Sequence, residues 1–456
     1  MNIYKKKVID FFAGHKMDYQ SIDLEKNCDL FQNEMCLGLN ATNKENILML
    51  PTYINAGDAI PSNEPVVVID AGGTNLRVAL VSFNDSGEAV IEHFESYKMP
   101  GTSYKISADD FYETIYEYLL PILGKSDKIG FGFSFPIEIF PNKDGLVLDL
   151  SKELKIPDLI GTMLGEGLLK KISEKGAFEN KSIVVLNDTT ATLLAGKSAC
   201  PNRTFESYIG MILGTGFNIC YIEKNRNIKK LQAYDENSDD NMIINMEAGS
   251  YGSAPLGKID ADYDAGTDSA GRFRFEKTIS GAYQGGLILT AIKQAALEGL
   301  FSEGFSDRLS ALEELSSKDI DDFLYYPYSP RHSKLAALVH DEDSAEPAGD
   351  THDSDRAILY YIIDAVIERI AMFITFSLAS IMKKTNTGKN PCAPVCVNVD
   401  GSTFYRSKQL RSKLDHYVKT FINDQEGLYL EFVKAENGAV IGSAIAALQN
   451  ASLPEE

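Results

Sequence analysis

Cysteine is scarce in this chain, and the cysteines that occur follow no pattern. The six thiols among 456 residues are scattered, which disfavours a disulfide framework and suits a reducing compartment, so we expect a cytoplasmic protein. Cys392 and Cys396 have three residues between them, which is not the usual spacing of a zinc pair, and no second pair or nearby histidine completes a site. The six histidines are equally dispersed and offer no ligand cluster. We therefore expect no zinc centre.

Basic residues are also in deficit. The chain has 44 lysines and arginines against 65 aspartates and glutamates, which gives a formal net charge of −21 at pH 7. This charge would repel phosphate-rich surfaces, so nucleic acids and anionic membranes are disfavoured as partners. Because the chain as a whole is negative, an anionic nucleotide would have to be bound by hydrogen-bond donors in its own binding site.

Long apolar runs are lacking too. The most apolar stretch is 357–382, but its uncharged part, 370–382, is shorter than the roughly 20 residues of a spanning helix, and charged residues interrupt what precedes it. We expect a buried core helix there. The N-terminus starts with basic residues, but no hydrophobic core of a signal peptide follows. Together these features predict a globular protein without a membrane partner.

A glycine-threonine turn occurs twice, each time between two short apolar runs. Gly72, Gly73 and Thr74 follow the run 66–71, and Gly214, Thr215 and Gly216 follow the run 208–213. Glycine permits a positive φ and a close approach of the backbone, so successive N–H groups can converge on an anion, and threonine adds a hydroxyl donor. Two such hairpins that face each other would form a phosphate clamp.

The chain is long enough for two domains, and its two halves repeat one plan. We expect helices before about residue 60, ending near Met49–Tyr53. Next come the first hairpin, a strand at 90–94, a helix after Ser107, and strands at 128–134 and 182–186. The second half repeats the hairpin, with helices at 278–297 and 357–382 and a strand at 395–399. The acidic segments 235–241 and 340–355 are expected to be solvated loops. The repetition predicts two α/β halves with a cleft between them.

Asp188 follows shortly after the apolar strand 183–186 and precedes a helical run. It could cap that helix, because aspartate is a preferred N-cap residue. Alternatively, it could be a base exposed in the cleft that accepts the proton of a substrate hydroxyl during phosphoryl transfer. The sequence leaves both interpretations open.

Further amides and carboxylates occur at other expected strand ends or turns. An amide offers both a donor and an acceptor, and a set of amides with carboxylates suits vicinal hydroxyls, so we expect a sugar rather than a protein substrate. The residues of this set are Asn187, Asp188, Asn218, Asn245 and Glu247.

Several motifs together resemble the eukaryotic-type hexokinase family, in their order and over most of the chain. They are Met49–Tyr53, Asp70–Val78, Gly132–Pro136, Leu186–Thr189, Leu213–Asn218, Ile244–Glu247 and Asn398–Ser402. The resemblance implies an α/β protein with the actin-like ATPase (ribonuclease H-like) fold and two lobes with a hinged cleft. It also implies ATP-dependent phosphorylation of a hexose, expected to be glucose, at the 6-hydroxyl with Mg²⁺. The small lobe would comprise residues 62–190 and about 440–456, and the large lobe 1–61 and 191–439.

The resemblance also assigns roles by matching motif. Asp188 would be the general base, and Lys152 would neutralise charge at the transferring phosphoryl group. The contacts to the sugar or that phosphoryl group would come from Ser134, Phe135, Pro136, Ser151, Lys152, Asn187, Asp188, Asn218, Asn245 and Glu247. Asp70 would orient Mg²⁺ through water. The nucleotide would be bound by Asp70, Gly72, Gly73, Thr74, Asn75, Arg77, Gly214, Thr215, Gly216, Gly401 and Ser402.

Three positions depart from the family pattern. Ala248 replaces a tryptophan, Ser151 replaces a threonine, and Gly286 replaces the glutamate of a Ser-Gly-x-Tyr-x-Gly-Glu segment, which the resemblance implies would bind sugar hydroxyls. We therefore expect weaker glucose binding or an altered choice of hexose. Two other functions stay open: a catalytically weak sugar sensor, and a different actin-like ATPase such as a chaperone-type machine. The oligomeric state is open as well.

Overall fold

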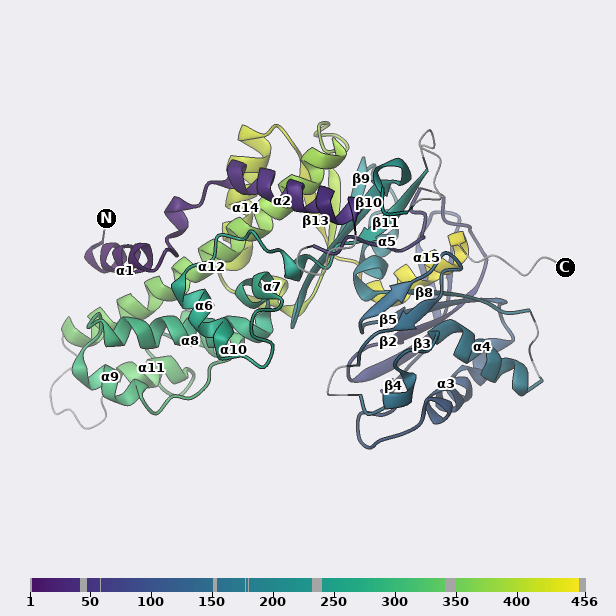
Figure 1. Cartoon of the computed structure of the whole chain (residues 1–456), viewed down its shortest axis with the longest axis horizontal. Coiled ribbons are helices and arrows are strands. Elements are labelled where there is room, and N and C mark those ends of the chain that lie inside the picture. Colours follow the sequence, from purple (N-terminus) through teal and green to yellow (C-terminus); the bar gives the residue numbers. More distant parts are fainter. Residues whose placement is uncertain are drawn as a thin grey trace.

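The protein has two lobes, each built on its own β-sheet (Figure 1). The computed structural model describes residues 2–41, 47–57, 59–150, 154–176, 178, 180–231, 240–340 and 350–450. It is a mixed α/β structure, as the sequence predicts.

The sheet of the first lobe has five strands in the order β4-β3-β2-β5-β8. They are β2 (Val66–Ala71), β3 (Asn75–Phe83), β4 (Ala89–Lys98), β5 (Lys128–Phe133) and β8 (Ser182–Leu186). Strands β2, β5 and β8 are parallel, whereas β3 and β4 run antiparallel to their neighbours. Helices α3 (Ala108–Leu123) and α4 (Leu164–Glu174) share one apolar core with this sheet. Ser107 caps α3 through a capping box, which confirms the expected start of that helix. A small hairpin of β6 (Ile137–Ile139) and β7 (Gly145–Val147) completes the lobe.

The second sheet has six strands in the order β1-β11-β10-β9-β12-β13. They are β1 (Leu50–Pro51), β9 (Ser207–Leu213), β10 (Phe217–Lys224), β11 (Asn241–Asn245), β12 (Val395–Asp400) and β13 (Leu430–Val433). Strands β9, β12 and β13 are parallel, and β10, β11 and β1 are antiparallel to their neighbours. The run β11-β10-β9-β12-β13 therefore repeats the order and directions of the first sheet. This repetition confirms the expectation of two similar halves.

Helices cover the second sheet and extend away from it (Figure 1). The α-helices are α1 (Ile3–Gly14), α2 (Leu24–Asn40), α6 (Lys258–Ala265), α7 (Arg274–Ile279), α8 (Gly281–Leu297), α9 (Glu303–Leu309), α10 (Ser317–Tyr325), α11 (Lys334–Val339), α12 (Asp350–Thr385), α13 (Ser402–Arg406) and α14 (Leu410–Tyr417). Short 3₁₀ turns are η1 (Tyr19–Ser21), η2 (Pro157–Leu159), η3 (Asn225–Asn227) and η4 (Ala248–Ser250), and η5 (Val418–Gln425) is a π-helix. Helix α12 contains the apolar run and is buried in the core, as expected. None of the helices in the described part of the chain combines the length and apolar character that crossing a membrane would require.

Two helices lie between the sheets and contact both halves. Helix α5 (Asp188–Ala199) packs on α15 (Gly438–Asn450) and also on β9 and β12, and α15 packs on β2, β5 and β8. The contacts are close because glycines occur at the crossings. A Cβ at Gly442 would lie 1.9 Å from the Ala191 carbonyl oxygen, and one at Gly130 would lie 2.1 Å from that of Ser443. The close packing between the lobes therefore requires glycine, which has no side chain, at these positions.

Three expectations about secondary structure were wrong in part. Helix α2 ends at Asn40, and residues 50–51 form an edge strand instead of a helix end. Residues 350–355 belong to α12, although their acidic composition predicts a loop, because packing of the apolar residues further along extends the helix. The expected helix at 278–297 is divided at Ser280 into α7 and α8. The other loop predictions fall mostly on 232–239 and 341–349, outside the described residues.

Candidate active site

The carboxyl ends of the parallel strands bring polar side chains from both lobes to one region. Asp70 lies near the end of β2, Asp188 directly follows β8 and Asn187, and Asp400 ends β12. The Asp70 charge raises the pKa of Asp188, and the Asp400 charge raises the pKa of Asp70, so these carboxylates lie near one another. Open α/β sheets place their ligands at such strand ends. This edge is therefore the candidate site.

Asp188 does not cap the helix that it starts. The cap is Asn187, whose Oδ1 accepts a hydrogen bond of 2.9 Å from the Thr189 N–H. Burial raises the pKa of Asp188 to about 6, an effect that hydrogen bonds from Thr189 oppose and the Asp70 charge reinforces. A carboxylate with this pKa is ionised near neutral pH and can still accept a proton. The structure therefore assigns the capping role to Asn187, and the role of Asp188 as a base stays a prediction.

An amide-carboxylate network lies on β10 and β11. The Asn218 amide nitrogen donates to Asn245 Oδ1 at 2.7 Å, and the Asn245 amide nitrogen donates to Glu247 Oε1 at 2.8 Å. Glu247 has left-handed backbone angles, φ 55° and ψ 48°, which are unusual for glutamate and often occur at functional sites. Burial raises the pKa of Glu247, and the neighbouring carboxylates of Asp188 and Glu276 raise it further. The structure therefore brings three of the predicted sugar-binding residues together.

Glu276 is a member of this cluster that the sequence reasoning missed. Its Oε2 accepts a hydrogen bond of 3.0 Å from the Phe217 N–H, next to the second glycine turn. A Cβ at Gly216 would lie 3.1 Å from Oε2, and one at Gly249 would lie 2.9 Å from the Glu276 Cβ. Burial raises the pKa of Glu276. In the sequence, Glu276 is one glutamate within a short helical segment, and its partner is 59 residues away, so no local signal marked it.

Position 286, where the sequence analysis noted a missing carboxylate, faces a tyrosine instead. A Cβ at Gly286 would lie 2.7 Å from both Cε2 and Oη of Tyr263 in α6. The carboxylate that adjoins Glu247 comes from Glu276 in α7. Tyr263 therefore fills the space at position 286, and the expected effect of the missing carboxylate on hexose binding stays a prediction.

The two glycine turns form hairpins, as predicted, but for a different reason. None of Gly72, Gly73, Gly214 and Gly216 has a positive φ, so these turns do not use the left-handed backbone that glycine permits. Glycine at 214 is required by space, because a Cβ there would lie 3.2 Å from the Gly401 Cα. Gly401 itself has φ 119°. The second turn and the start of α13 thus pack backbone against backbone.

The first turn has a charged residue on each side of its base. Arg77 Nη1 lies 2.7 Å from Asp70 Oδ2, and Asp70 is 3% exposed. Burial raises the pKa of Asp70, and the Arg77 guanidinium opposes this shift. Within the described part of the chain, no three histidine, cysteine, aspartate or glutamate side chains gather as a protein-made metal site would need. Asp70 and Asp400 instead suit an ion that binds mainly to nucleotide phosphates, as Mg²⁺ often does.

Four more predicted residues, Ser134, Phe135, Ser151 and Lys152, divide into three groups. Ser134 lies within reach of Asp188 and lowers its pKa. Phe135 is 5% exposed and packs on Phe133 at 5.0 Å between ring centroids, so its ring belongs to the core. Ser151 and Lys152 lie outside the described residues.

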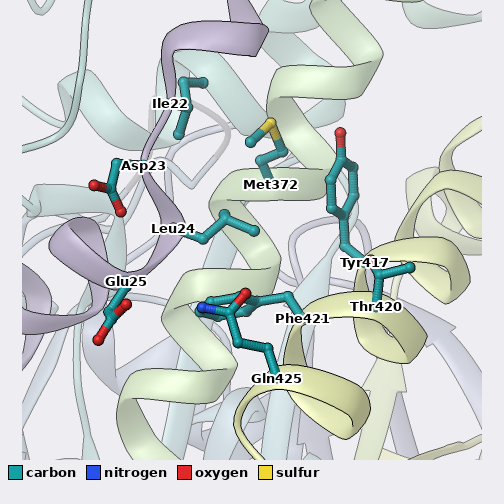
Figure 2. A pocket seen from close by; sticks show the side chains of 9 residues that line it. All are labelled: Ile22, Asp23, Leu24, Glu25, Met372, Tyr417, Thr420, Phe421 and Gln425. Atoms are coloured by element: carbon teal, nitrogen blue, oxygen red, sulfur yellow. The ribbon is translucent and has the colours of Figure 1, made fainter.

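A hollow of about 290 Å³, separate from these strand ends, lies on the second lobe between α2, α12 and η5 (Figure 2). Its polar groups have structural partners: Asp23 caps α2 by accepting from the Lys26 N–H, and the Tyr417 hydroxyl donates to Glu368 at 2.7 Å. It belongs to elements other than the strand ends that carry Asp188 and Asp70. This hollow is therefore not the candidate active site.

The fold and the arrangement of the strand ends define an actin-like ATPase fold, and two solved structures share it. One is the hexokinase from Schistosoma mansoni complexed with glucose, with a TM-score of 0.72 and 21% identity over 98% of both chains. Another hexokinase crystal structure has a TM-score of 0.75 and 19% identity, covering 98% of this chain and 100% of that one.

Family comparison then gives the narrower assignment. One family model described as Hexokinase matches residues 208–449, and a second with the same description matches residues 13–198. Because the first match alone covers more than half of the chain, the protein belongs to the hexokinase family.

Curated relatives agree with this assignment. Hexokinase-1 of Schizosaccharomyces pombe is 26% identical over 443 residues, which are 92% of this chain and 86% of that protein. Hexokinase-1 of Mus musculus is 26% identical over 430 residues, which are 91% of this chain and 42% of that protein. The chain thus spans less than half the length of the mouse relative.

Proposed function

We propose that this protein transfers the γ-phosphoryl group of ATP to the 6-hydroxyl of a hexose, with glucose the expected acceptor. The observation that carries the proposal is the position of Asp188. Its carboxylate, with a pKa of about 6, interacts electrostatically with Asp70, which precedes the first glycine turn, and with Glu247 in the amide-carboxylate network. A base at this point can contact a sugar hydroxyl and the phosphoryl donor at the same time.

The roles of the neighbouring residues follow from their chemistry. Asn218, Asn245, Glu247 and Glu276 supply amide and carboxylate oxygens for the ring hydroxyls of the sugar, and Asp188 removes the proton from the attacking hydroxyl. Backbone N–H groups of the two glycine turns and of α13 are positioned for the nucleotide phosphates. Asp70 and Asp400 would hold Mg²⁺ through its water ligands, and the ion would neutralise phosphate charge when bound. Ser151 and Lys152 keep their predicted contacts to the acceptor or the phosphoryl group as part of this proposal.

We propose residues 62–190 with about 440–456 as the small lobe, and 1–61 with 191–439 as the large lobe. The packing of α15 on β2 and β5 supports this division. The hinge would lie where α5 and α15 cross. Closure of the lobes on the sugar would exclude water, which otherwise competes with the hexose as the nucleophile. A cytoplasmic location is part of the proposal, and the six free thiols are consistent with it.

An assay of ADP release with glucose, fructose, mannose and N-acetylglucosamine, in the presence of ATP and Mg²⁺, tests the proposal. Sugar-dependent ADP release that Asp188→Asn abolishes is the expected result. Sugar-independent release would support another kind of ATPase. Sugar binding without turnover in the wild type would support a sensor, and either result would overturn the kinase assignment.

A further inference from the structure

Lys277 is a buried lysine that the proposed reaction does not use. It lies in α7, next along the chain to Glu276, and it is 1% exposed. Each of its three ammonium hydrogens has an acceptor. Nζ donates to Asp264 Oδ1 at 2.5 Å, to Thr267 Oγ1 at 2.7 Å and to the Ser269 carbonyl oxygen at 2.7 Å. A buried ammonium group with all of its donors satisfied is confined to one position.

The acceptors all belong to the segment 264–271, which leads from the end of α6 toward α7. The second carboxylate oxygen of Asp264, Oδ2, accepts a hydrogen bond of 2.9 Å from the Gly271 N–H. Burial raises the pKa of the Asp264 carboxyl, but hydrogen bonds from Lys277 and the Gly271 N–H outweigh this effect and hold the pKa below its ordinary value. The connection between the two helices is thus organised around one buried ion pair, which we call the Lys277–Asp264 pair.

Helix α7 depends on such contacts for its position. It has six residues, Arg274–Ile279, and Phe273 caps it without a side-chain hydrogen bond. Helices this short are not stable by themselves, so their packing determines where they lie. A buried ion pair adds little net stability, because desolvation of both charges offsets most of their attraction. The Lys277–Asp264 pair therefore contributes chiefly a fixed geometry, in which α7 is tied to the segment before it.

Glu276, the neighbour of Lys277 on α7, extends from this helix to the candidate site. Its Oε2 accepts a hydrogen bond of 3.0 Å from the N–H of Phe217, which directly precedes Asn218 of the amide-carboxylate network. A Cβ at Gly249, just after β11, would lie 2.9 Å from the Glu276 Cβ. The Glu276 carboxylate is thus closely packed, and a displacement of about 1 Å is enough to lose much of the value of a contact in a site.

We propose that Lys277 is a positioning residue for the acceptor site: the Lys277–Asp264 pair fixes α7, and α7 holds the Glu276 carboxylate where the hexose binds. This inference rests on the proposed function, in which Glu276 accepts hydrogen bonds from the ring hydroxyls of the sugar. Lys277 is buried and contacts neither the hexose nor the nucleotide itself. It therefore acts on sugar affinity, while proton transfer to Asp188 does not involve it.

The test uses a double variant that leaves no single charge alone in the protein interior. Lys277→Met removes the donors and retains an unbranched side chain, and Asp264→Asn in the same protein removes the partner charge. The new amide oxygen can still accept a hydrogen bond from the Gly271 N–H. The matched control is Lys413→Met, which removes another lysine of the second lobe that is paired with a carboxylate, Asp364 at 2.7 Å.

Steady-state kinetics with glucose separates positioning from stability. If the pair only stabilised the fold, the double variant would contain fewer folded molecules, so kcat would fall while KM stayed unchanged. We expect instead that KM for glucose rises about tenfold or more, as for the loss of one charge-assisted hydrogen bond, and that kcat changes less than KM. Lys413→Met should leave KM unchanged. An unchanged KM in the double variant would overturn the proposal.

Glu276→Ala shows whether Lys277 acts through Glu276. This variant alone should raise the KM for glucose. In its background there is no carboxylate left to position, so the changes at Lys277 and Asp264 should raise KM by no more than about twofold further. A further rise as large as the one in the wild-type background would overturn the proposal, because it would mean that the pair acts on sugar binding by another route.

Amide hydrogen exchange at Phe217 tests the positioning without any assay of activity. Its N–H donates to Glu276, so its exchange reports whether the carboxylate stays in place. In the double variant we expect exchange at Phe217 to be faster relative to the other amides of β10, since a general loss of stability would raise all of them. Lys413→Met should not change this ratio.

The two readouts distinguish failure of the inference from failure of the kinase assignment. If the wild type did not phosphorylate glucose, the kinase assignment would fail, and with it the role of Glu276 toward the sugar. Selectively faster exchange at Phe217 would still support positioning of Glu276 by Lys277. An unchanged exchange ratio in the double variant would overturn that positioning, whether or not glucose is a substrate.

Discussion

The ring of Tyr263 occupies the space in which a side chain at position 286 would begin. Cε2 and the hydroxyl oxygen of Tyr263 each lie 2.7 Å from where that Cβ would be, a distance that real Cβ atoms do not show. The glycine at 286 and the tyrosine at 263 therefore depend on each other. This relationship changes what a substitution at 286 is expected to do.

Gly286→Glu is expected to destabilise the protein without tightening hexose binding. Overpacking of this kind typically costs about 1–3 kcal/mol of unfolding free energy. Thermal unfolding and the KM for glucose measure both effects. In the double variant Gly286→Glu with Tyr263→Ser, the shortened side chain makes room, so Tm should recover part of the loss, with Tyr263→Ser alone as the control. A single variant that bound glucose more tightly at an unchanged Tm would contradict this prediction.

Asp188→Asn is expected to abolish most turnover while leaving hexose binding within a few-fold. Asparagine retains the shape of the side chain but cannot accept the proton, and loss of a general base typically costs about 10²–10⁴-fold in rate. Initial rates of ADP release and a sugar titration check the two halves of the prediction. Turnover near that of the wild type would remove Asp188 from the role of base.

The pH dependence of activity should show the Asp188 pKa of about 6. The carboxylate must be ionised to accept a proton, so kcat/KM should fall about tenfold per pH unit below that value. Rates measured between pH 5 and 8 on one stable preparation check this. A profile that stayed flat down to pH 5 would show that Asp188 is not the titrating base.

The same rise in the pKa of Asp188 also predicts how this residue affects the stability of the folded protein. Burial raises the pKa of Asp188 from 3.8 to about 6 on folding, so the folded state binds more protons than the unfolded state between these values. Stability contributed by the protonated form is present below the lower value and is lost as the pH rises through the upper one. Asp188→Asn should therefore be more stable than the wild type at pH 7.5, by on the order of 1–3 kcal/mol, with a smaller difference at pH 5. Thermal melts of both proteins at these two pH values test the prediction; a variant that melts lower at pH 7.5 would refute it.

Glu247→Gln and Glu276→Gln should each weaken sugar binding. A charge-assisted hydrogen bond contributes about 1.5–3 kcal/mol, which corresponds to roughly ten- to a hundredfold in affinity. The KM for glucose should rise accordingly, whereas Glu313→Gln, at an exposed position outside the cluster, should leave it unchanged. If only Glu247→Gln had an effect, Glu276 would be assigned to holding the Phe217 backbone instead.

Closure of the lobes on hexose should reduce the radius of gyration. The chain contains no tryptophan, so intrinsic tryptophan fluorescence cannot report the movement, and small-angle scattering with and without saturating glucose is the suitable measurement. The control is a sugar that the same preparation does not phosphorylate. An unchanged radius in a preparation that turns over glucose would count against closure.

The sequence was informative where a short segment carries its own pattern. The apolar run before Asn187 and the two turns between apolar runs predicted β8 and both hairpins, and the order of motifs predicted the fold. Sequence could not reveal Glu276, because its place in the site depends on α7 packing against the turn before Phe217. It also could not show that the space at position 286 is limited by Tyr263 in another helix. Packing between distant segments determined both.

The crossing of α5 and α15 has a consequence for synthesis on the ribosome. Strands β2, β5 and β8 are complete once residue 186 has been made, but the helix that covers one of their faces begins at Gly438. In the folded protein α15 packs on the apolar side chains of that face, Val66, Val68 and Val184 among them, and this cover is missing during translation of the intervening 251 residues. The sheet of the first lobe is thus translated early, but this lobe is among the last parts of the protein to be finished. The nascent chain is expected to need protection from aggregation through that interval, as incompletely folded species with exposed apolar surface do.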